Sequence, residues 1–105
     1  MKDKRITNIE DISTKEYTSY INCVFINLEI EDLVFYNIKF SKCSFINCKL
    51  DNVDFVSCIF YNCDFISNKY IENSWYDNYG KNLRFIGALP NFIKDNTFIN
   101  LEVIE

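Results

Sequence analysis

The stretch that decides the fold is residues 38–67, which read IKFSKCSFINCKLDNVDFVSCIFYNCDFIS. A Phe or a Leu occupies every fifth position of this stretch, and the spacing continues in both directions from residue 18 to residue 77. The residues in this central row are Tyr20, Phe25, Ile30, Phe35, Phe40, Phe45, Leu50, Phe55, Phe60, Phe65, Tyr70 and Trp75. A period of five fits neither a helix nor the two-residue alternation of an ordinary strand. A short fixed repeat predicts a β-solenoid.

A second row lies two positions before each central residue, and it is small or aliphatic from residue 23 to residue 63. We expect both rows to point inward and the other, largely polar positions to form the outer surface. Asparagine recurs two positions after the central residue, where its tolerance of unusual turn dihedrals suits a corner. The predicted structural core contains Phe25, Phe35, Phe40, Phe45, Leu50, Phe55, Phe60, Phe65, Cys43, Cys48, Cys58 and Cys63.

Units such as Cys43-Ser44-Phe45-Ile46-Asn47, Cys58-Ile59-Phe60-Tyr61-Asn62 and Cys63-Asp64-Phe65-Ile66-Ser67 resemble the pentapeptide-repeat family. The unit of that family is a small residue, a polar residue, Leu or Phe, and two variable residues. The resemblance implies an all-β fold, a right-handed quadrilateral parallel β-helix in which four pentapeptides form the four sides of one coil. The twelve units then give about three coils, with residues 20 apart stacked at about 4.8 Å.

The repeat divides the chain into an N-terminal cap at 1–17, the β-helix at 18–77, and a C-terminal cap or dimerisation segment at 78–105. In the first segment, Ser13-Thr14-Lys15-Glu16 has the form of a helical capping box. Ile6, Ile9 and Ile12 fit equally well as a layer lying flat on the first coil.

The last segment contains Gly80, Gly87 and Pro90, which indicate turns. Pro90 suits the first turn of a short helix at 91–95. Residues 97–104 are strongly β-prone. They fit either a last strand that closes the solenoid or a strand that pairs with a second molecule.

No motif indicates catalysis or a cofactor. The chain has no His, no Gly-rich phosphate loop and no nucleophile elbow, so we predict no enzymatic activity, no catalytic residues and no cofactor. The cysteine spacing places thiols on adjacent sides of the coil and not around one tetrahedral point, which argues against a metal site. We interpret the cysteines as small apolar core residues.

The net charge and the hydropathy pattern limit the classes of partner that we expect. The net charge of −4 provides no broad basic surface for direct contact with nucleic acid. No signal peptide and no long apolar run is visible, so we expect no membrane span. Five cysteines without a secretion signal predict reduced thiols and a cytoplasmic location.

Outer apolar residues predict a contact surface. Ile26, Ile46 and Ile66 are expected to stack on one outer side, and Phe98, Leu101 and Val103 add apolar residues in the last segment. Columns of this kind are typical of surfaces that touch another molecule. We therefore predict an interface with an unknown protein, with a homodimer as one form of it.

The predicted function is a non-enzymatic scaffold, a protein–protein interaction module of unknown role. The family resemblance implies one alternative: a mimic of duplex DNA that binds a type II topoisomerase such as gyrase and protects it from drugs or toxins. Acidic outer residues favour the alternative. Lys39, Lys42, Lys49 and Lys69 offset much of their charge.

Overall fold

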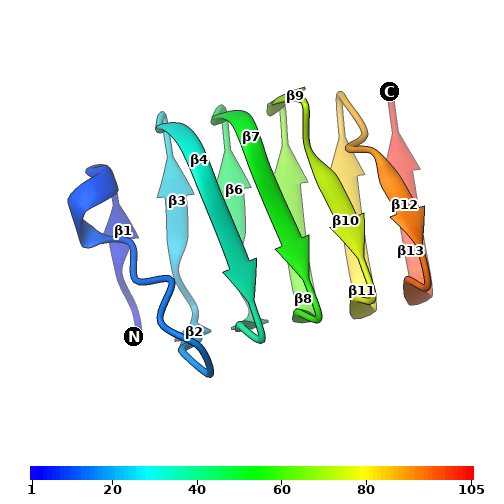
Figure 1. The fold of residues 1–105 in the computed structure, drawn as a ribbon, viewed down its shortest axis with the longest axis horizontal. Helices are drawn as coiled ribbons and strands as arrows, with labels where there is room; N and C mark the ends of the chain where they lie inside the picture. The colour runs from blue at the N-terminus through cyan, green and yellow to red at the C-terminus, as the bar shows by residue number, and fades with distance from the viewer.

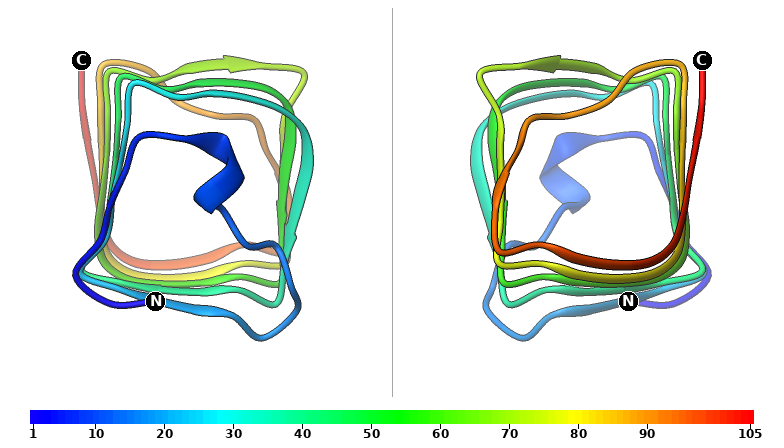
Figure 2. Two further views of the ribbon diagram at one scale, coloured as in Figure 1. Left: turned by 90° about the vertical axis from the view of Figure 1, so that its left-hand side faces the viewer. Right: turned by 90° about the vertical axis from the view of Figure 1, so that its right-hand side faces the viewer.

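The computed structural model describes residues 1–105, and the chain winds into a coil of stacked parallel strands (Figure 1) with a square outline (Figure 2). Viewed from its N-terminal end, the chain turns clockwise as it recedes, so the coil is right-handed (Figure 2). The predicted quadrilateral β-helix is confirmed. The elements in chain order are β1 (Arg5–Ile6), η1 (Ile9–Asp11), β2 (Ser19–Ile21), β3 (Val24–Ile26), β4 (Glu29–Tyr36), β5 (Lys39–Ser41), β6 (Ser44–Ile46), β7 (Lys49–Val56), β8 (Ile59–Ile66), β9 (Lys69–Ile71), β10 (Ser74–Tyr76), β11 (Tyr79–Ile86), β12 (Phe92–Lys94) and β13 (Thr97–Ile104).

The strands stack in register along the long axis of the molecule. The longest stack follows the order β1-β3-β6-β8-β11-β13, and a second follows β12-β10-β7-β4. Phe25 pairs with Phe45 and Phe45 pairs with Phe65, so each central residue lies over its counterpart four pentapeptides later. The four predicted columns of central residues are therefore present.

The corners are built by residues with positive φ. From Asn22 to Asp77 each of them lies two positions after a central residue, as Asn47 does with φ 52°. Asn and Asp favour this left-handed region because their side chains bond locally. Asn47 Nδ2 also donates to Asn27 Oδ1 at 2.8 Å, so corner side chains of successive coils bond to one another.

The core is one column-like cluster along the axis of the coil. All of the predicted core residues are buried in it, together with Trp75, Leu83 and Phe85. The thiols fill the second inward row. Asn68, Asn73 and Asn78 occupy the same row in the later turns and are also buried.

The predicted count of three coils is too low, because the coil makes about five turns. The regular offset continues beyond residue 77, where Ile59 pairs with Tyr79 and Ile66 pairs with Ile86. A further layer follows with a shorter offset, pairing Ile86 with Ile104.

Neither short helix suggested by the sequence forms. In the first segment the chain forms the 3-10 turn η1, which is capped by Asn8, and no helix begins at Ser13. After Pro90 the chain forms strand β12, which pairs with β10 in parallel. In both places packing against the adjacent coil overrides the local preference.

Candidate protein-interaction surfaces

The C-terminal end of the solenoid leaves core positions uncovered. In β13, Phe98, Leu101 and Val103 stack over Gly80, Leu83 and Phe85 of the preceding coil. No further coil covers them, so Leu101 is 39% exposed and Val103 is 43% exposed. These three predicted interface residues therefore lie in the inward columns of the last coil and not on an outer side.

One edge of strand β13 is unpaired at this end of the solenoid. This strand has eight residues and pairs only with β11, so the sheet ends at its far edge. Free strand edges are templates for pairing, and proteins usually protect them with Lys, Pro or a bulge. The only charged side chain of β13 is Glu102. Exposed Ile93 and Ile99 extend the apolar character of this end.

The N-terminal end is closed by contrast. The segment with η1 folds across the opening of the first coil (Figure 2). Ile6 of β1 is only 2% exposed, and Ile12 packs against the core. The hydroxyl of Tyr20 donates to the Ser13 carbonyl at 2.6 Å and accepts from the Ser13 amide at 2.7 Å. The two ends of the solenoid are therefore different surfaces.

One outer side carries an unbroken column of isoleucines. Ile26, Ile46 and Ile66 stack as predicted, and the column continues through residues 86 and 104. We call Ile26, Ile46, Ile66, Ile86 and Ile104 the isoleucine column. The last two members were missed because the repeat was expected to end at residue 77, although they follow at spacings of 20 and 18.

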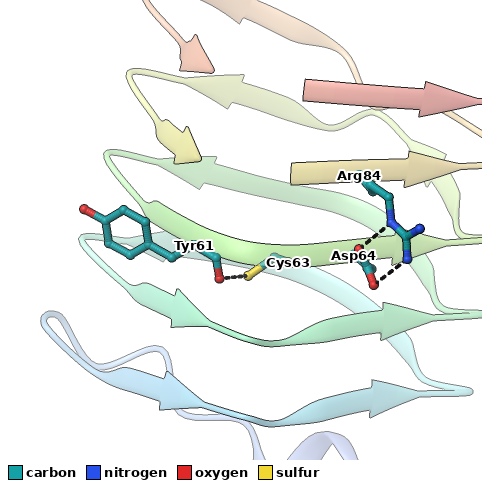
Figure 3. Close-up of polar contacts among 4 residues, drawn as sticks. All are labelled: Tyr61, Cys63, Asp64 and Arg84. Atoms are coloured by element: carbon teal, nitrogen blue, oxygen red, sulfur yellow. Dashed lines mark hydrogen bonds and ion pairs between the residues drawn. The ribbon is translucent and has the colours of Figure 1, made fainter. Parts of the chain in front are cut away.

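A mixed polar column runs beside the isoleucine column on the same strands. We call this the flanking column; its members in order are Arg5, Val24, Ser44, Asp64, Arg84 and Glu102. Within it Arg84 donates to both oxygens of Asp64, at 2.9 and 3.0 Å (Figure 3). These hydrogen bonds raise the pKa of Arg84. The two columns together form a flat side, which we call the isoleucine wall.

The cysteines are buried and hydrogen-bonded to the backbone. Cys63 Sγ donates to the carbonyls of Tyr61 at 3.3 Å and Phe40 at 3.4 Å (Figure 3). Burial raises the pKa of Cys58 to about 12, which keeps that thiol protonated. Interaction with the neighbouring Cys43 thiol, together with burial, raises the pKa of Cys63, and the same interaction lowers the pKa of Cys43. Buried thiols of this kind behave as small apolar residues with a weak donor.

The acidic residues on the outside do not converge. Asp51, Asp54 and Asp64 lie on different sides or at different levels of the coil, on outward positions of β7 and β8. No group of three His, Cys, Asp or Glu side chains is placed to hold a metal ion. None of the helical segments has the length and apolar character needed to cross a membrane.

The centre of the coil matches a known protein-family model. Residues 34–67 match the family model described as Pentapeptide repeats (8 copies). The matched segment runs from β4 to the corner after β8, in the centre of the coil. No curated protein matches the chain.

Proposed function

We propose that this chain, whose residues 34–67 match the family model of pentapeptide repeats, serves as a non-enzymatic scaffold that binds a protein partner at its C-terminal end. A stacked coil in which every layer bonds to its neighbours is a rigid support, because no side of it can move without breaking a ladder. Such a coil presents fixed surfaces at its sides and ends.

The observation that carries the proposal is the uncovered last coil. Leu101 and Val103 occupy core columns but remain exposed, and the adjacent edge of β13 has no strand partner. A segment of another protein that adds a strand to this edge would cover both side chains and satisfy the free backbone groups. The partner chemistry that fits is an extended segment with apolar residues at alternate positions.

The experiment is titration with a synthetic peptide of alternating Thr and Val, flanked by lysines for solubility. We expect saturable binding by fluorescence anisotropy, at least tenfold weaker for Leu101→Lys. A matched control is Tyr36→Lys, which places the same charge on an exposed position of β4 away from the end. Absence of saturable binding, or equal binding by Leu101→Lys, contradicts the proposal.

The topoisomerase alternative stays a prediction. A gyrase supercoiling assay with the added protein tests it directly, since a DNA mimic inhibits or protects the enzyme in that assay.

A further inference from the structure

The isoleucine wall is a second surface, separate from the C-terminal end. Its isoleucine column is half-buried from Ile26 to Ile86, and Ile104 is exposed. Every rung is fixed by strand pairing, so the column is straight and continuous along the length of the coil. A continuous apolar column on a rigid side is not needed for the fold, because the core lies on the other face of the same strands.

We propose that two copies of the chain pair through their isoleucine walls, with their coil axes antiparallel. A two-fold axis parallel to the strands and midway between the levels of Ile46 and Ile66 generates this dimer. Ile46 then meets Ile66 of the second copy, and Ile26 meets Ile86 of the second copy. Such an interface is isologous, because the same patch serves both copies.

The alternative two-fold arrangement, with parallel coil axes, is disfavoured by charge. In that arrangement the facing strands of the two copies would run in opposite directions. The isoleucine column of one copy would then lie over the flanking column of the other. Asp64 and Arg84 would then each lie beneath an isoleucine side chain, and burying such charges against apolar groups is costly. The antiparallel arrangement also covers both residues, but it places Asp64 opposite the Ser44 hydroxyl of the second copy and Arg84 opposite Val24. The antiparallel arrangement keeps isoleucines on isoleucines.

The charges at the two ends of the flanking column fit the antiparallel arrangement. Arg5 stands at the first level of the wall and Glu102 stands at the last. The two-fold axis brings Arg5 of each copy opposite Glu102 of the other, so the interface has an opposite-charge contact at both ends. Within one chain the two residues are five levels apart, about 24 Å at 4.8 Å per level.

The size of the wall sets the strength of the dimer. The long dimension of the molecule is 29 Å. Five residues per side at about 3.3 Å give a width of about 17 Å, and hence a flat area of about 480 Å². A standard stable interface buries about 800 Å² per partner. The dimer therefore belongs to the weak class and dissociates on dilution.

The test is sedimentation velocity over a concentration series from about 5 μM to 1 mM, with each fold checked by circular dichroism. We expect the weight-average mass to rise toward that of a dimer in the wild type and to stay monomeric in Ile46→Lys. The matched control, Val56→Lys, introduces the same charge at a half-buried outer position of another side, and we expect it to dimerise as the wild type does.

A charge-exchange series tests the arrangement. We expect Arg5→Glu and Glu102→Arg each to weaken the dimer severalfold, and the double variant to restore it. Restoration requires contact between copies, because the two residues are distant within one chain. The proposal is overturned by a monomer at all concentrations, by equal loss in Val56→Lys, or by a double variant no better than the single ones. A dimer that survives Ile46→Lys but is lost in Leu101→Lys also overturns it, in favour of contact through the C-terminal end.

Discussion

The rings of Phe25 and Phe45 are stacked, with centroids 4.3 Å apart and planes within 3° of parallel. They belong to successive coils and pair across β3 and β6. This separation is shorter than a typical rise between parallel strands of about 4.8 Å. The two rings therefore lie face to face in direct contact, one coil above the other.

Removing one ring from this column opens a cavity on both sides. Phe45 is stacked on Phe25 and Phe65, and it is 1% exposed. We expect Phe45→Ala to lower the free energy of unfolding by about 3–5 kcal/mol. Urea denaturation measures the change. The control Tyr36→Ala, at an exposed position, should change stability by less than about 0.5 kcal/mol. Equal effects in both variants would contradict the assignment of Phe45 to the core.

Trp75 carries the buried side-chain nitrogen that has no hydrogen-bond partner. Its column also contains Phe35, Phe55 and Phe92, and its ring lies 4.5 Å from that of Phe55. Trp75→Phe removes the unsatisfied donor at the expense of some apolar area. Because an unpaired buried donor costs about 1–3 kcal/mol, we expect a change in unfolding free energy near zero. A loss comparable to that of Phe45→Ala would show that the indole nitrogen has a partner.

Asn78 bridges two coils through its buried side chain. Its Nδ2 donates to the Phe55 carbonyl at 2.9 Å, and its Oδ1 accepts from the Cys58 amide at 2.8 Å. Asn78→Leu leaves both backbone groups unpaired, so we expect a loss of about 2–4 kcal/mol by thermal or urea denaturation. Asn91→Ala, at an exposed position, serves as the control and should be nearly neutral. An Asn78→Leu variant as stable as the control would rule out this bridge.

The pKa of Cys58 predicts a dependence of stability on alkaline pH. The folded value of about 12 lies above the ordinary value of 9.0, so the folded state keeps a proton that the unfolded state loses. The stabilisation is complete below pH 9 and is lost as the pH rises toward 12. Between these limits the loss is about 1.4 kcal/mol per pH unit for one group.

Cys58→Ala removes that group, so its stability should fall less steeply with pH than that of the wild type. Denaturation at a series of pH values from 8 to 11 measures both slopes. A variant with the wild-type slope would show that Cys58 ionises in the folded state as easily as in the unfolded one.

The sequence predicts the columns well because every central position from 20 to 75 has a large side chain. The prediction fails at residue 80, where the five-residue spacing continues but the central residue is Gly. A Cβ at Gly80 would lie 2.8 Å from Cδ1 of Phe98, so the ring from the next coil takes the space of the missing side chain. Paired residues are 19 apart in the first layer, between β1 and β3, and 18 apart in the last layer, between β11 and β13. Because neither spacing is the 20 residues of the regular coils, the repeat does not predict these two layers.

The candidate surfaces, too, can be predicted only in part from the sequence. The first three members of the isoleucine column follow from spacing alone, because residues that are one full coil apart must share a side. The exposure of Leu101 and Val103 could not be predicted from the sequence, since Leu and Val are ordinary core residues. It depends on whether another layer follows them, which is a property of the whole assembly and not of local sequence.

The most direct test of the extended coil is an NMR measurement of contacts between backbone protons of residues in adjacent coils. The structure predicts cross-peaks between the strands containing Ile66 and Ile86, and between those containing Ile86 and Ile104. Absence of both sets, with the cross-peaks between Ile46 and Ile66 retained, would contradict the account, because the coil would then end before β11.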